Sequence, residues 1–249
     1  MFSRRISARY NRGRVPPFGG LPIGFSLVTS VPCLQWVQGD LGVDVEGGLV
    51  TRWADQQSGA WHYTQGSGTQ QPIYEATSFG GRPGLLFDGV DDCMNSALAL
   101  DAASSTPKFI WALISQITWV ANHYLFACSP STRNGIFQGP TTPSLQIQNG
   151  ITGSFSNGAT LGTMARVEAF YNNNTTDFIK AAGVNASGIN AFTGAATTST
   201  TIGAQSSAGT VAVNFRIGAL GVFAALPTVP ERNALSAWAQ AYGGPTVGI

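Results

Sequence analysis

Short apolar runs and turn signals alternate along most of the chain. Runs rich in β-branched and aromatic residues are separated by turn-forming pairs such as Asn134-Gly135 and Asn157-Gly158. This rhythm predicts an all-β sandwich or barrel. The predicted strands are Cys33–Val37, Gly84–Phe87, Phe109–Ile117, Tyr124–Ala127, Leu145–Gln148, Ala165–Tyr171, Asp177–Ala181, Thr198–Ile202 and Phe215–Phe223.

Two of these strands carry further information in their pattern. Phe109–Ile117 begins apolar on both alternating faces, which is typical of a central strand covered from both sides. Ala165–Tyr171 alternates more regularly, with Val167, Ala169 and Tyr171 on one face and two charged residues on the other. We therefore expect a layered structure.

One helix is predicted, near the C-terminus. Thr228 and Glu231 have the spacing of a capping box, and a proline stands in the first turn. Leu235, Trp238 and Tyr242 then recur on one face at i, i+3 and i+7, and a Gly-Gly-Pro sequence ends the pattern. We expect this helix to lie on a sheet.

Composition narrows the class of protein. The 249 residues are 43% hydrophobic but only 10% charged, which excludes a long helical bundle and a disordered chain. A surface solvated by hydroxyl and amide groups fits a subunit of an assembly, and it also fits a neutral monomer. Cys33, Cys93 and Cys128 are widely spaced and odd in number, which favours free thiols in a protein folded in a reducing cytoplasm.

Positive charge is concentrated at the start of the chain. We divide the sequence into an extended, basic, Gly/Pro-rich arm at residues 1–31 and one body at 32–249. The arginines of the arm suit docking on a partner protein better than nucleic-acid binding, because the body offers no basic face. No run is long enough for a membrane-spanning helix. The predicted docking residues are Arg4, Arg5, Arg9, Arg12 and Arg14.

Several motifs occur in a fixed order and together carry a resemblance. Trp53–Gly59 reads W-x-D-x-x-S-G, Phe87–Asp92 reads F-D-G-x-D-D, and Phe215–Phe223 precedes the terminal helix. In these features the chain resembles the concanavalin A-like lectin/glucanase superfamily, in the laminin-G-like form found in bacteriophage virions. The resemblance covers roughly residues 33–244. It implies a two-sheet antiparallel jelly-roll sandwich with one C-terminal helix.

Catalytic and metal-binding motifs are sparse. Only four glutamates occur, none begins the E-x-D-x-x-E motif of the glucanase branch, and no nucleophile elbow or phosphate loop is present. We therefore expect no enzymatic activity and no cofactor. Asp88, Asp91 and Asp92 form the densest acidic cluster, which could ligate Ca²⁺, but the spacing fits turn-capping carboxylates better.

A sugar site needs an exposed aromatic ring beside amide and carboxylate groups. Trp61, His62 and Tyr63 are the candidates, with a second aromatic segment at 119–124, although both also fit core or subunit packing. From the resemblance we expect a non-enzymatic phage virion protein, located in the virion as a capsid decoration, head fibre or tail component. Its arm would bind other virion proteins, and it would form homo-oligomers. The alternative is a carbohydrate-binding adhesin that recognises a host glycan.

Overall fold

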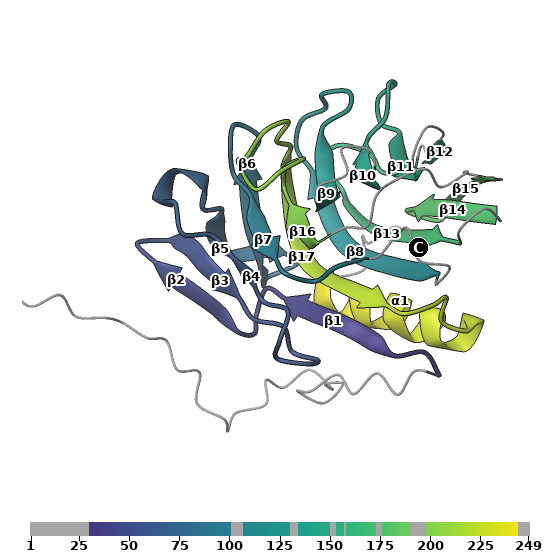
Figure 1. Ribbon diagram of the computed structural model, residues 1–249, viewed down its shortest axis with the longest axis horizontal. Helices are drawn as coiled ribbons and strands as arrows, with labels where there is room; N and C mark the ends of the chain where they lie inside the picture. Colours follow the sequence, from purple (N-terminus) through teal and green to yellow (C-terminus); the bar gives the residue numbers. More distant parts are fainter. Residues whose placement is uncertain are drawn as a thin grey trace, which may run out of the picture.

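The computed structural model describes residues 30–100, 107–129, 134–149, 153–156, 158–172, 176–189 and 198–243, and all structural statements below concern these. Of the predicted arm at 1–31, only Ser30 and Val31 are described, so its five arginines lie outside the described part. The rest forms two antiparallel sheets packed face to face with one α-helix outside them (Figure 1). The all-β sandwich with a C-terminal helix is thereby confirmed.

The sheet that carries the helix is called the back sheet. Each of its strand pairs is antiparallel, and β17 lies at its centre, between β8 on one side and β6 and β1 on the other. On one side of β17 (Asn214–Phe223), β6 (Arg82–Asp88) pairs with the first part of the strand and β1 (Cys33–Gln38) with the second part, and β5 (Ile73–Phe79) lies beyond β6. On the other side follow, in order, β8 (Lys108–Gln116), β13 (Met164–Tyr171), β14 (Thr176–Ala181) and β15 (Val184–Ile189).

The opposite layer is called the front sheet, and β3 (Leu49–Trp53) joins the two by pairing with β4 on one side and β5 on the other. A hairpin partner, β2 (Val43–Glu46), and a short 3-10 helix, η1 (Gly68–Gln70), lie at this junction. The strands of the front sheet in spatial order are β4 (Tyr63–Thr64), β7 (Met94–Ser96), β16 (Ser199–Ile202), β9 (Tyr124–Ser129), β10 (Asn134–Gln138), β11 (Leu145–Asn149) and β12 (Gly153–Ser156).

Strand β8 shows why the protein has three layers. Its side chains alternate between two apolar cores: Ile110, Ala112 and Ile114 face the interior of the sandwich, whereas Phe109, Trp111 and Leu113 face the helix. This arrangement confirms the prediction of a central strand covered on both sides. The inter-sheet core is otherwise built on fully buried rings, including the stacked pair Phe87 and Phe215, whose centroids are 5.0 Å apart.

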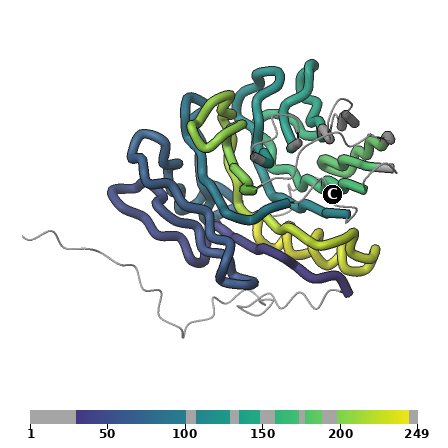
Figure 2. The backbone as a smooth tube through the Cα atoms, viewed as in Figure 1, coloured from purple at the N-terminus to yellow at the C-terminus, as the bar shows by residue number. Residues whose placement is uncertain are grey.

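Helix α1 (Val229–Gly243) lies across the outer face of the back sheet, as predicted. Trp238 makes edge contacts with Trp36 at 5.2 Å and with Trp111 at 5.6 Å, and it stacks on Tyr242 at 4.9 Å between ring centroids. Figure 2 shows that β1 and α1, from opposite ends of the sequence, run side by side. A side chain at Gly221 would collide with the ring of Trp36, so glycine is needed there.

The capping box predicted from Thr228 and Glu231 is present. The Glu231 carboxylate accepts hydrogen bonds from the backbone N–H of Thr228 at 2.6 Å and from its hydroxyl at 2.7 Å. The carboxylate also accepts hydrogen bonds from the backbone N–H and the hydroxyl of Ser30. Together, the hydrogen bonds from Ser30 and Thr228 lower the pKa of Glu231 to about 2. The cap thus ties the first described residues to the helix.

A buried ion network fixes the helix to β13. Glu168, with a side chain only 2% exposed, lies 3.1 Å from Nε of Arg166 and 3.5 Å from a guanidinium nitrogen of Arg232. Arg166 also donates to the hydroxyl of Ser236 on α1. Desolvation lowers the pKa of Arg166, although the charge of Glu168 acts in the opposite direction.

Among the described residues, no helix has the length and apolar character needed to cross a membrane.

The aromatic cluster under α1 should dominate the attachment of the helix. Replacing the buried Trp238 by alanine (Trp238→Ala) removes three ring contacts and leaves a cavity, so we expect the free energy of unfolding to fall by about 3–5 kcal/mol. Urea denaturation measures this loss. Asn233→Ala, at an exposed position of the same helix, is the control and should change stability by less than about 0.5 kcal/mol. Equal effects of the two variants would contradict the packing described here.

Candidate functional site

The loop that follows β3 is organised around one carboxylate, that of Asp55. Its Oδ1 accepts hydrogen bonds from the backbone N–H groups of Trp36 and Gln57, both at 3.0 Å. Its Oδ2 accepts from the backbone and hydroxyl of Ser58 and from the N–H of Trp61, at 3.2, 2.5 and 3.4 Å. Burial raises the pKa of Asp55, but these hydrogen bonds outweigh it, and the pKa is lowered overall. Asp55 therefore holds the loop in place as an anion.

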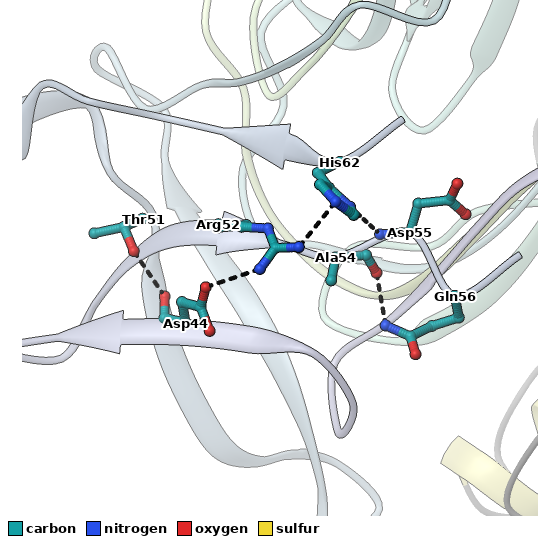
Figure 3. Close-up of polar contacts among 7 residues, drawn as sticks. All are labelled: Asp44, Thr51, Arg52, Ala54, Asp55, Gln56 and His62. Carbon is teal, nitrogen blue, oxygen red and sulfur yellow. Dashed lines mark hydrogen bonds and ion pairs between the residues drawn. The ribbon is translucent and has the colours of Figure 1, made fainter. Parts of the chain in front are cut away.

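The same loop brings His62 beside Arg52 of β3 (Figure 3). The backbone N–H of Asp55 donates to Nδ1 of His62 at 3.0 Å, and Nε2 of the ring lies 2.8 Å from a terminal nitrogen of Arg52. The guanidinium of Arg52 also forms an ion pair with the exposed carboxylate of Asp44 at 3.3 Å. The four residues form a continuous polar chain along the β2–β3 edge.

This chain has more hydrogen-bond donors than acceptors. A neutral imidazole has one acceptor nitrogen, yet both nitrogens of His62 face N–H donors, one from Asp55 and one from Arg52. At least one of these donors therefore lacks an acceptor within the pair. Arg52 is 40% exposed, so a ligand oxygen can reach the donors that the protein leaves unsatisfied.

Of the three residues predicted for a sugar site, the structure brings Trp61 and His62 to the surface region and places Tyr63 in the core. Trp61 is partly exposed, and its carbonyl is held by Gln35 and by the hydroxyl of Ser96. Tyr63 is fully buried on β4, and its hydroxyl lies 3.2 Å from that of Thr200. Because strand side chains alternate, Tyr63 belongs to the inter-sheet core and cannot contact a ligand.

The predicted acidic cluster is also brought together. One carboxylate oxygen from each of Asp88, Asp91 and Asp92 lies within 4.8 Å of the other two, a spacing that could hold a hard cation such as Ca²⁺. The turn-capping interpretation is supported too, since Asp88 accepts from the N–H of Val90 at 2.8 Å and Asp92 from that of Asp88 at 2.9 Å. The pKa of Asp92 is raised to about 7, chiefly by burial and also by the negative charges of Asp88 and Asp91. The hydrogen bond from the N–H of Asp88 acts in the opposite direction.

The rings of the second aromatic segment, 119–124, pack largely against other parts of the protein. Trp119 packs against the inter-sheet core, and its Nε1 is buried without a partner in the described part of the chain. Nδ1 of His123 contacts the carbonyl of Ala212. Tyr124 is buried and stacks on Phe137 with 5.0 Å between centroids. Tyr124 is therefore closed to a ligand, whereas Trp119 is partly exposed, as Trp61 is.

Sequence reasoning missed Arg52 and Asp44 as members of the site. The signal was available, because Val43–Glu46 alternates apolar and acidic residues with the period of a strand. Such a strand pairs with the next one, and the register Asp44–Arg52 then brings the two charges together. The predicted sugar site was placed at Trp61, His62 and Tyr63 instead.

Comparisons with known proteins add information on the fold. No family model and no curated protein matches the chain. Among solved structures, it is similar to a GH54 α-L-arabinofuranosidase soaked with a cyclic sulfate inhibitor (TM-score 0.60, 10% identity, 86% of this chain and 63% of that chain). It is also similar to Trypanosoma rangeli sialidase in complex with sialic acid (TM-score 0.59, 14% identity, 82% of this chain and 33% of that chain).

A third similar structure is described as the HCR/D W1238A mutant (TM-score 0.59, 7% identity, 83% of this chain and 52% of that chain). At these identities the similarity establishes the sandwich fold. The chain spans between one third and somewhat under two thirds of the length of these proteins.

Two sequence-based expectations are corrected by these comparisons. We expected a phage virion structural protein without enzymatic activity. The structures that the chain resembles are instead named as glycoside hydrolases, an arabinofuranosidase and a sialidase, and nothing among them supports a virion role. The resemblance to phage proteins rested on short turn motifs, which any sandwich with similar loops can carry. Docking by the arginine arm and homo-oligomer formation stay predictions.

The carboxylate of Asp55 should control both loop order and acid stability. Its pKa is lowered, so its contribution to stability is present above the unfolded value of about 3.9 and is lost as the pH falls below it. Asp55→Asn replaces one of the two acceptor oxygens by an NH2 donor that faces N–H groups, and we expect the free energy of unfolding at pH 7 to fall by about 2–3 kcal/mol. The stability of this variant should also depend less on pH below about 4. Denaturation between pH 2 and 7 measures both.

Asp44→Asn is the matched control, since its carboxylate is 60% exposed and its surface ion pair should contribute less than about 1 kcal/mol. If Asp55→Asn were no more destabilising at pH 7 than Asp44→Asn, Asp55 would not organise the loop.

Proposed function

We propose that this protein binds carbohydrate, using the loop at Asp55–His62 and the adjoining β2–β3 edge. The observation that carries the proposal is the donor-rich pair of Arg52 and His62, with the partly exposed Trp61 next to His62 in sequence. Aromatic rings contact the apolar face of a sugar, and fixed donors bind its hydroxyl oxygens. The donors lacking acceptors at Arg52 and His62 suit such an oxygen-rich ligand.

Preorganisation supports this assignment. The Trp61 backbone is held on both sides, its N–H by Asp55 and its carbonyl by Gln35 and Ser96. His62 is oriented by the backbone of Asp55, and Arg52 by Asp44. A ligand would therefore meet groups whose conformational entropy has already been lost on folding, which favours affinity. The similar sandwiches from carbohydrate-active proteins agree with this proposal.

We further propose that the chain belongs to the concanavalin A-like superfamily.

Removal of the aromatic ring should abolish most of the binding. In a glycan array followed by calorimetry on the full chain, we expect Trp61→Ala to weaken the best ligand by about tenfold or more. Tyr63→Phe is the matched control, because its hydroxyl is buried against Thr200 and should not affect affinity. No glycan bound by the unmodified protein, or equal effects of both substitutions, would refute carbohydrate binding at this loop.

A second function, glycoside hydrolysis, is favoured by the environment of Asp92. This carboxyl group is buried, its pKa is raised to about 7, and carboxylate oxygens of Asp88 and Asp91 lie within 4.8 Å. Retaining glycosidases use two carboxyl groups about 5 Å apart, one protonated as general acid and one ionised. In this role Asp92 would donate the proton and a neighbouring carboxylate would act as the nucleophile.

Hydrolysis of 4-nitrophenyl glycosides, including the α-L-arabinofuranoside, tests this second function. Because the acid must be protonated, the rate should fall as the pH rises through about 7. Asp92→Asn keeps an oxygen for the N–H of Asp88 but loses the proton, so activity should drop at least about 100-fold. Glu46→Gln, at an exposed acid on β2, is the control. Activity that survives Asp92→Asn would dismiss Asp92 as the acid.

A further inference from the structure

The outer face of the back sheet continues beyond the helix at β14 and β15. Ile179 and Ala181 face the inter-sheet core, so the alternating positions Phe178 and Lys180 face outward. The register places Ser187 opposite Phe178 and Asn185 opposite Lys180, and both partners on β15 are exposed.

These outward residues adjoin the ion network at the start of α1. Lys180 stands opposite Glu168 in the register of β13 and β14, and Arg232 of α1 lies over the ring of Phe178, 5.9 Å from its centroid. We name the surface formed by Phe178, Lys180, Asn185, Ser187 and Arg232, together with the buried Arg166 next to it, the cationic shelf.

The shelf carries an excess of positive charge. Glu168 is the one carboxylate that pairs there, and it is shared by Arg166 and Arg232 at 3.1 and 3.5 Å. Lys180 has no ion-pair partner within the described ranges. The Nε atom of Arg232 is buried and lacks an acceptor among the described residues. Asp177, the acid of β14, points to the opposite face by strand alternation and accepts a hydrogen bond from the N–H of Asn172.

The neighbouring groups restrict the anion that fits. Asn185 and Ser187 offer amide and hydroxyl groups for ring hydroxyls, next to the edge of an aromatic ring, which is the chemistry of a sugar contact. A polyanion such as nucleic acid fits poorly, because the described residues carry seven Lys and Arg against eleven Asp and Glu. A sugar ring that carries a single carboxylate matches both the cations and the amide and hydroxyl groups of the shelf.

We propose that the cationic shelf binds the carboxylate of an acidic saccharide, a uronic acid or a similar sugar acid. Lys180 and the exposed edge of Arg232 contact the carboxylate, and Asn185 and Ser187 contact ring hydroxyls. The inference rests on the proposed carbohydrate binding for its class of ligand. It adds a second subsite, on the opposite sheet from Trp61, and a preference for acidic over neutral glycans.

Calorimetry on the full chain with tetragalacturonate and with the neutral galactotetraose tests the shelf. We expect tetragalacturonate to bind at least about tenfold more tightly at low salt, and the advantage to shrink at 0.5 M NaCl. Lys180→Gln should weaken tetragalacturonate by about tenfold and leave the neutral sugar unchanged, whereas Lys180→Arg should retain the affinity.

Lys108→Gln is the matched control, since Lys108 is the other lysine of the chain and stands at a position of β8 that alternates to the inner face. Equal affinity for the two sugars, or equal effects of Lys180→Gln and Lys108→Gln, would overturn the shelf. If neutral glycans then still bound in a Trp61-dependent manner, the proposed function would stand without it. Failure of every acidic and neutral glycan to bind would overturn both.

Discussion

The need to cover both faces of the back sheet governs the structure. Along β8, aromatic and aliphatic side chains point alternately into two separate cores, and each large side chain contributes about 1.5–3 kcal/mol when fully buried. The front sheet covers one face. Without α1, the rings of Phe109 and Trp111 on the other face would be exposed to water. The sequence of one strand thus demands a third layer, and the last helix supplies it.

The contact between this third layer and β13 contains a buried network of charged side chains. The helix covers the back sheet, and the charged pair Arg166 and Glu168 on β13 is buried beneath it. Burial of the pair costs desolvation energy, which the hydrogen bonds to Ser236 and the second ion pair with Arg232 offset. Such a network fixes the helix in one register more than it stabilises it. The surplus cations are a consequence of that arrangement.

Strands with a strong apolar signal could be predicted from the sequence, and those at the sheet junction could not. Phe109–Ile117 and Phe215–Phe223 lie within a residue of their observed bounds. Strands β2 and β5 are largely exposed and rich in polar residues, so their hydrophobic pattern is weak. The pairing of β2 with β3 and of β5 with β6 decides their conformation. The helix was predictable because its cap and its apolar stripe are both local in sequence.

The candidate site could be predicted only in part, for a similar reason. Trp61 and His62 stand out as residue types, but whether a ring is displayed or buried depends on strand phase, and β4 turns Tyr63 inward. Arg52 gains its place from the pairing of β2 with β3, a contact that spacing alone does not reveal. Arg232 and Lys180 are far apart in sequence, and both adjoin Glu168 only because the helix folds back over the sheet.

Fold similarity does not decide between binding and hydrolysis, but the environments of two carboxylates separate these roles. Asp55 accepts five hydrogen bonds, so its negative charge is fixed and its lone pairs are occupied in positioning the Trp61 loop. It cannot exchange a proton without disordering that loop. Asp92 accepts one backbone hydrogen bond and faces two like charges, which leaves it able to hold a proton near neutral pH. Under the two proposed functions, Asp92 in the turn after β6 would therefore serve acid catalysis, and Asp55 in the loop after β3 would serve to hold the Trp61 loop for recognition.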